Sequence, residues 1–160
     1  MNITLRRALI EDSKMILDWR NESTTIPWMG SAQSLSFNEH DNWFKKTLND
    51  PNCIFLIIES NSKPVGQIRF HLDSSDNNYA RVSINITQKM HGKGIASLAF
   101  SKGNTLVKEI GFASKIFAHV RQDNIGSIKA MENAGYEKTS NIEKHGVKHL
   151  VMQYTINAET

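Results

Sequence analysis

The residues best suited to chemistry stand in the stretch HGKGIASLAF, His91–Phe100, where two glycines and a lysine fall within four residues before the sequence turns apolar. If a helix starts near residue 95, its first N–H groups lack partners inside the helix, and its dipole makes that end positive. Gly92 and Gly94 let the backbone approach a ligand, and Lys93 and His91 add positive charge. Together these features suit an anion such as a pyrophosphate. Glycines alone are equally typical of a plain turn, and neither the P-loop nor the G-x-G-x-x-G spacing is present.

The flanking elements must place this stretch between the end of a strand and the start of a helix. Residues 79–87, YARVSINIT, alternate with Ala80, Val82, Ile84 and Ile86 on one face, which predicts a strand. Apolar residues at helical spacing from about residue 95 to 110 predict a helix that ends near Gly111. Strand, glycine stretch and helix follow one another in the order that an anion cradle requires.

The rest of the chain predicts a mixed arrangement of strands and helices. Ser36 with Glu39 three residues later indicates a capping box that opens a helix. Strands dominate early and alternate with helices later, so the predicted fold class is α/β, with a single mixed central β-sheet flanked by about four helices. No repeat or linker interrupts residues 1–160, which predicts a single domain. The other expected strands cover 2–9, 53–60, 64–73, 115–120 and 147–156, and the other helices start after Asp12 or Ser13, after Ser36 and at 127.

Composition narrows the classes of partner. The 160 residues are 39% hydrophobic with a net charge of +3, as in ordinary globular proteins. This charge is compatible with an anionic ligand and too small to indicate nucleic acid. Cys53, the sole cysteine, offers neither a disulfide nor a metal-ligand pair, and its apolar neighbours predict a buried thiol. No run approaches about 18 apolar residues, so we expect no membrane span, no metal and a cytoplasmic location.

Two motifs resemble the GNAT acetyltransferase superfamily. HGKGIA is similar to its [RQ]-x-x-G-x-[GA] pyrophosphate loop, with His91 standing where Arg or Gln is usual. NIGSIKAMENAGY, residues 124–136, is similar to its N-x-x-[SA]-[IL]-x-x-[YF]-E-[KN]-x-G-[FY] segment. The resemblance implies the GNAT fold and acetyl-CoA as co-substrate. The residues that it assigns to acetyl-CoA are Ile86, Thr87, His91, Gly92, Lys93, Gly94, Ile95, Ala96, Asn124, Ser127 and Met131.

Acetyl transfer to an amine requires held reactants, removal of a proton from the amine and an N–H near Ile86 for the oxyanion. Many relatives carry a tyrosine seven residues after the asparagine to protonate the leaving thiolate, whereas Met131 here cannot donate a proton. Either the thiolate leaves unprotonated, or water or another side chain serves. The candidates on strands are Ser83, Asn85 and His119, although the alternation around His119 favours an exposed strand histidine over a catalytic one.

The segment from Leu17 to Leu48 resembles sugar-nucleotide amine acetyltransferases of nonulosonic-acid synthesis, such as the pseudaminic-acid enzyme. This implies a UDP-linked 4-amino-deoxy sugar as acceptor, with Arg20, Trp28 and His40 binding it. Alternatively, Arg20 pairs with Asp18 or Glu22, and the tryptophans at 19 and 43 belong to the core. A peptide-amine acetyltransferase of the ribosomal-protein type and a non-catalytic acyl-CoA-binding regulator remain alternatives, and the oligomeric state stays open, a homodimer included. The residues that carry the resemblance are Trp19, Arg20, Asn21, Trp28, Met29, Glu39 and His40.

Overall fold

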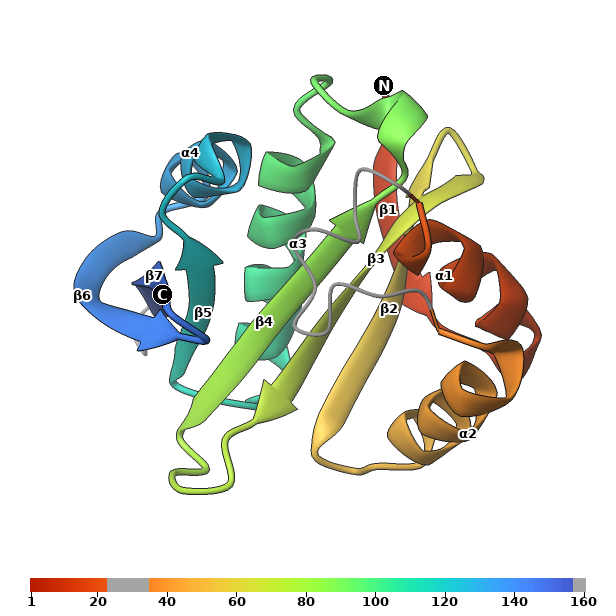
Figure 1. The fold of residues 1–160 in the computed structure, drawn as a ribbon, viewed down its shortest axis with the longest axis horizontal. Coiled ribbons are helices and arrows are strands. Elements are labelled where there is room, and N and C mark those ends of the chain that lie inside the picture. Colours follow the sequence, from red (N-terminus) through yellow and green to blue (C-terminus); the bar gives the residue numbers. More distant parts are fainter. Residues whose placement is uncertain (23–34, 157–160) are drawn as a thin grey trace. The chain divides into compact units, whose positions relative to one another are not determined.

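The computed structural model describes residues 1–22 and 35–156, and its strands form a seven-stranded sheet in the order β1-β2-β3-β4-β5-β7-β6 (Figure 1). β4 and β5 are parallel, while β1–β2, β5–β7 and β6–β7 are antiparallel. The predicted α/β class with a mixed sheet and four helices is therefore confirmed. The strands are β1 (Ile3–Arg7), β2 (Cys53–Ser60), β3 (Lys63–Leu72), β4 (Tyr79–Ile86), β5 (Lys115–Arg121), β6 (Glu137–Lys144) and β7 (Val147–Thr155), and the helices are α1 (Ser13–Arg20), α2 (Phe37–Leu48), α3 (Ile95–Glu109) and α4 (Ile125–Asn133).

The chain divides into two compact units. Unit 1 comprises Met1–Arg69 with Ile84–Ile95, and unit 2 comprises Phe70–Ser83 with Ala96–Thr160. None of the helices in the described part of the chain is long and apolar enough to cross a membrane.

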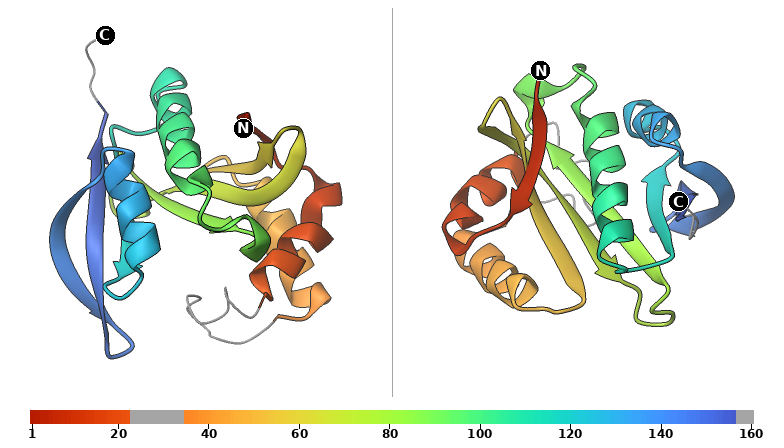
Figure 2. Two further views of the ribbon diagram at one scale, coloured as in Figure 1. Left: turned by 90° about the horizontal axis from the view of Figure 1, so that it is seen from above. Right: turned by 180° about the vertical axis from the view of Figure 1, so that it is seen from behind.

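Unit 1 contains an apolar cluster to which α1, α2 and β2 contribute residues, and Figure 2 shows α1 and α2 side by side. Trp19 and Phe44 belong to it with Phe55 of β2, and Trp43 packs against its edge, so both tryptophans lie in or against the core. Ser36 caps α2 as predicted, because its Oγ accepts the Glu39 N–H at 3.3 Å. This cap fixes the point at which α2 begins.

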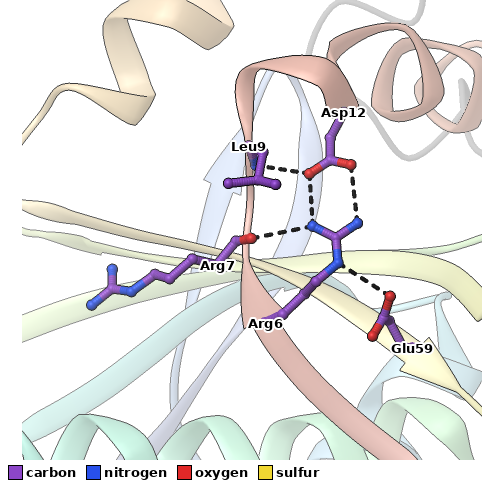
Figure 3. Close-up of polar contacts among 5 residues, drawn as sticks. All are labelled: Arg6, Arg7, Leu9, Asp12 and Glu59. Carbon is purple, nitrogen blue, oxygen red and sulfur yellow. Dashed lines mark hydrogen bonds and ion pairs between the residues drawn. The ribbon is translucent and has the colours of Figure 1, made fainter. Parts of the chain in front are cut away.

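An arginine fork fixes the start of α1 against the sheet (Figure 3). The guanidinium of Arg6 donates to both carboxylate oxygens of Asp12, at 2.9 and 3.0 Å, and to Glu59 at 3.1 Å. Asp12 also accepts the Leu9 N–H at 2.7 Å. Burial opposes ionisation of Asp12, but the hydrogen bonds from Arg6 and Leu9 outweigh it and hold the pKa of this carboxyl below its ordinary value.

Unit 2 packs α3 against one face of its strands. Buried Ile116 and Ala118 of β5 and Met152 of β7 form that face. Tyr136 donates its hydroxyl to Asn104 Oδ1 of α3 at 2.7 Å, and its ring contacts Phe100 and Tyr154. The opposite face of the strands carries Phe117 and His119, as the alternation of β5 predicts.

Sequence analysis missed β6. Glu137–Lys144 is polar and mostly exposed, because this strand lies at the edge of the sheet and buries little. The signal was the turn that follows it, where His145 and Gly146 have φ of +50° and +76° and join β6 to β7 as a hairpin.

Candidate active site

The glycine stretch forms a loop between β4 and α3 with a short helical turn at Gln88–Met90 (Figure 1). Gly92 and Gly94 both have φ of +77°, with an ordinary φ at Lys93 between them. A Cβ added at either glycine would meet no atom within 4 Å, so backbone conformation, not crowding, requires glycine there. Left-handed residues alternating with ordinary ones favour an anion nest, and the exposed Lys93 adds a cation. The loop therefore fits a pyrophosphate.

His91 braces this loop against the end of β4. Its ring Nε2 lies 2.8 Å from the carbonyl oxygen of Ile86, and since a carbonyl only accepts, Nε2 carries the proton and donates. Nδ1 is the ring atom that remains for a ligand, and it donates to a phosphate only when the ring is protonated. The structure thus shows a bracing contact of His91, and its binding to a pyrophosphate stays a prediction.

A contact that sequence analysis missed joins Glu22 to the start of the donor loop. Thr87 donates its hydroxyl to Glu22 Oε2 at 2.7 Å, and the Gln88 N–H donates to Oε1 at 3.1 Å. Next to Glu22, the Asn21 side chain bonds both backbone groups of Leu35 at 3.1 Å. No local sequence pattern predicts these hydrogen bonds, because Glu22 and Thr87 are 65 residues apart.

A close backbone approach between β3 and β4 depends on Gly66. A Cβ at this position would lie 2.4 Å from the carbonyl oxygen of Asn85 and 3.0 Å from Cα of Ile86. Beside it the alternation of β4 departs from expectation: Asn85 is buried and Ile84 only half-buried. Gly66 thus supports the backbone at Ile86, where we predicted the oxyanion N–H.

The three catalytic candidates fall in different places. Asn85 belongs to unit 1, whereas Ser83 and His119 belong to unit 2. The parallel register pairs Arg81 of β4 with Phe117 of β5, and by alternation Ser83 and His119 lie on the same face as that pair. The structure therefore brings Ser83 and His119 onto one surface.

His119 is a neutral imidazole at pH 7. Burial, followed by the charges of Lys144, Arg81 and His149, lowers its pKa to about 4, while Asp73 acts in the opposite direction. Its Nδ1 is buried and has no hydrogen-bond partner among the described residues. A base of this strength removes a proton from an ammonium poorly. The lowered pKa and the unpartnered Nδ1 favour His119 as a hydrogen-bonding group over a general base.

The second predicted acetyl-CoA segment forms the start of α4. Asn124 accepts the Ser127 N–H through Oδ1 at 3.3 Å, which leaves its amide nitrogen for a ligand. Met131 is 4% exposed and buried in unit 2. The predicted roles of Asn124, Ser127 and Met131 toward acetyl-CoA stay predictions.

The predicted acceptor residues lie in and beside α1 and α2. Arg20 is half-buried, and burial lowers the pKa of its guanidinium. His40 is fully buried with its ring stacked on Phe44 at 5.8 Å, and its pKa is lowered mainly by burial and further by the charge of Arg20. The charge of Arg20 thus acts on His40, and the binding of an acceptor by these two residues stays a prediction. Trp28 lies outside the described residues, and Asp18 pairs with Lys14.

Comparisons with known proteins define the class. The model of the acetyltransferase (GNAT) domain matches residues 2–137, and the chain therefore belongs to this family. Membership confirms the predicted family, whose model describes an acetyltransferase (GNAT) domain. No cluster of His, Cys, Asp and Glu that could hold a metal ion occurs among the residues that the structure describes.

Individual relatives are distant. An uncharacterized protein of Methanocaldococcus jannaschii is 27% identical over 140 residues, which are 86% of this chain and 28% of that protein, so this chain spans little more than a quarter of its relative. The solved aminoglycoside acetyltransferase AAC(6')-Ib with coenzyme A superposes with a TM-score of 0.85 at 17% identity, covering 96% of this chain and 95% of that one. Spermidine N-acetyltransferase of Vibrio cholerae, with CoA and spermine, gives a TM-score of 0.84 at 19% identity, with coverage of 96% and 95%.

Proposed function

We propose that this chain transfers acetyl from acetyl-CoA to a primary amine, and that the acceptor is a UDP-linked 4-amino-deoxy sugar of surface-glycan (nonulosonic-acid) synthesis. The observation that carries the proposal is the pair of Glu22 contacts to Thr87 and Gln88. They join the end of the W-R-N segment, which resembles the acceptor site of sugar-nucleotide enzymes, to the loop that fits the acetyl-CoA pyrophosphate.

This link has a direct chemical use. Acetyl transfer gains most from holding thioester and amine together, and misplacement by about 1 Å costs roughly a hundredfold in rate. Asn21, which follows Arg20, and Leu35, which precedes α2 with His40, are hydrogen-bonded to each other. Glu22 follows Asn21 directly and accepts hydrogen bonds from Thr87 and Gln88. The predicted acceptor segment is therefore tied to the start of the donor loop. Both substrates would thus be positioned by one hydrogen-bonded framework within unit 1.

Charge supports an anionic acceptor. Arg20 is a planar, permanently charged group suited to phosphate, and the chain carries a net charge of +3. Aminoglycosides and polyamines, on which the two structural neighbours act by name, are polycations, and a cationic site repels them. A UDP diphosphate complements the same charges.

The acceptor class is tested by following CoA thiol release with acetyl-CoA and four acceptors: a UDP-4-amino-4,6-dideoxy sugar, spermidine, kanamycin and a peptide with a free N-terminus. Turnover with the UDP-sugar supports the proposal. Turnover only with the peptide supports the ribosomal-protein type, and turnover only with the polyamine or aminoglycoside refutes an anionic acceptor. Acetyl-CoA binding without turnover of any acceptor supports the non-catalytic regulator. A single GNAT domain over residues 1–160 and a cytoplasmic location stay predictions alongside it.

A further inference from the structure

Unit 2 presents a sheet face on which positive side chains gather. The face opposite α3 follows from strand register: Arg81 of β4 pairs with Phe117 of β5, and His119 of β5 lies opposite Val151 of β7. Register also places His149 of β7 on this face, opposite Arg121. Lys144, at the end of β6, lies opposite Val147 and so joins the same face. We call the surface formed by Arg81 and Lys144, with His119 and His149 beside them, the cationic face.

The charges of this face act on one another. Lys144, Arg81 and His149 each disfavour protonation of His119, and Arg81 disfavours that of Lys144. These residues come from four strands, and the strand register places them on the same face of the sheet. His149 donates Nδ1–H to the Val147 carbonyl at 3.0 Å, which leaves its Nε2 for a ligand.

The repulsion on this face is poorly compensated. Asp73 is the acidic group that favours protonation of His119. In the described parts of the chain, no carboxylate lies within 4.0 Å of the charged nitrogens of Arg81 or Lys144. Elsewhere on the face compensation is present, because Arg121 binds Asp123 at 2.9 Å. Cations held together without a counter-charge make binding of a polyanion favourable.

An aromatic row borders these cations. Tyr79, Phe117 and His119 follow one another on the same face, with ring centroids 6.4 and 5.4 Å apart. Lys115 covers part of the row, since its ammonium lies 5.3 Å from the Tyr79 ring. Half-buried rings beside unpaired cations offer both a stacking surface and phosphate donors, which a nucleoside diphosphate requires.

We propose that the cationic face is a second anion site, separate from the donor loop, and that it takes the diphosphate of a nucleotide-bearing ligand. Arg81 and Lys144 are its phosphate donors, and His119 hydrogen-bonds at its floor. The residues of this anion site all belong to unit 2, and the site does not rest on the proposed function.

The test uses full-length protein saturated with CoA, so that the donor loop is filled. Inorganic pyrophosphate and UDP are titrated by calorimetry, and the histidine ring signals are followed by NMR. We expect pyrophosphate to bind and to raise the pKa of His119 from about 4 by roughly one unit, because it neutralises the neighbouring cations. Arg81→Gln and Lys144→Gln should each weaken binding roughly tenfold.

Lys138→Gln is the matched control, because Lys138 lies on the same strand as Lys144 but opposite Met152, on the other face. It should leave pyrophosphate affinity unchanged, and Lys144→Arg should retain it. Circular dichroism confirms that each variant is folded. Absence of pyrophosphate binding, or equal losses in Lys138→Gln and Lys144→Gln, overturns the site. If the site binds UDP but no UDP-amino sugar is acetylated, the anion site stands and the proposed acceptor is wrong. If the sugar is acetylated equally by Arg81→Gln and wild type while pyrophosphate binding is lost, the site serves another diphosphate ligand.

Discussion

Replacing Gly66 with alanine tests whether the junction of β3 and β4 positions the donor site. The new Cβ would lie 2.4 Å from the Asn85 carbonyl oxygen and 3.0 Å from both Cα and Cδ1 of Ile86. Real contacts of this kind stay above about 3.0 Å, so the strands must separate by at least about 0.6 Å. The obstacle is mainly backbone, which cannot rotate away as a side chain can. Gly66 has no positive φ, so the effect is steric alone.

Both stability and acetyl-CoA handling should respond. Overpacking of this size costs about 1–3 kcal/mol of unfolding free energy. A displacement approaching 1 Å at a reacting centre costs up to roughly a hundredfold in rate, and about 0.6 Å a smaller part of that. We therefore expect Gly66→Ala to weaken acetyl-CoA binding and to lower kcat/KM by roughly tenfold. Calorimetry with acetyl-CoA and thiol release measure the two effects.

Gly126→Ala supplies the comparison, because a Cβ there meets no atom within 4 Å and the glycine lies in α4. It should raise stability by up to about 1 kcal/mol through helix propensity. If Gly66→Ala matches wild type in melting temperature and in acetyl-CoA affinity, the close approach does not position the site, and the reasoning from the 2.4 Å contact is wrong.

Four other substitutions test separate parts of the structure. Gly94→Ala should keep the fold, since the added Cβ meets no atom within 4 Å, but at φ of +77° it strains the loop by about 1–2 kcal/mol. Calorimetry should therefore show roughly tenfold weaker acetyl-CoA binding. Unchanged affinity contradicts the role of this loop as an anion cradle. Arg20→Ala should raise the KM of the UDP-sugar and leave that of acetyl-CoA unchanged, whereas equal effects on both indicate a structural arginine. Glu22→Ala leaves the buried Thr87 hydroxyl without its acceptor, which costs about 1–3 kcal/mol of stability. It should raise the KM of both acetyl-CoA and the UDP-sugar, and Glu22→Gln should restore part of the loss. If neither KM changes, the link between Glu22 and the donor loop is refuted. Asp12→Asn should remove the acid sensitivity that Asp12 gives to the free energy of unfolding. The folded pKa of Asp12 lies below its ordinary 3.8, so its stabilisation is present above about pH 4 and is lost as the pH falls through the folded value. Urea unfolding that shows the same pH dependence for both proteins contradicts this.

Sequence periodicity predicted most of the fold because most elements bury one face. The alternation of residues 115–120 and the capping pair at Ser36 and Glu39 describe local geometry, and the structure contains both. The sequence did not predict β6, because an exposed edge strand needs no apolar alternation and its conformation is determined by its partner in the sheet. The class of enzyme was also readable, since the glycine loop and the segment after Asn124 are contiguous and carry their spacing with them.

The residues that support the site could not be predicted from the sequence, because their partners are distant in the chain. Gly66 resembles any strand glycine until Asn85 is seen beside it, and Glu22 resembles a surface carboxylate until Thr87 and Gln88 are found to bind it. In each case the partner is distant in sequence, and the chemistry of either residue alone is ordinary. The positions that recognise a cofactor are therefore recorded in local motifs, whereas the residues that hold those motifs in place are defined by tertiary contacts. It follows that two relatives could share the HGKGIA loop and still differ in acetyl-CoA affinity through Gly66 and Glu22.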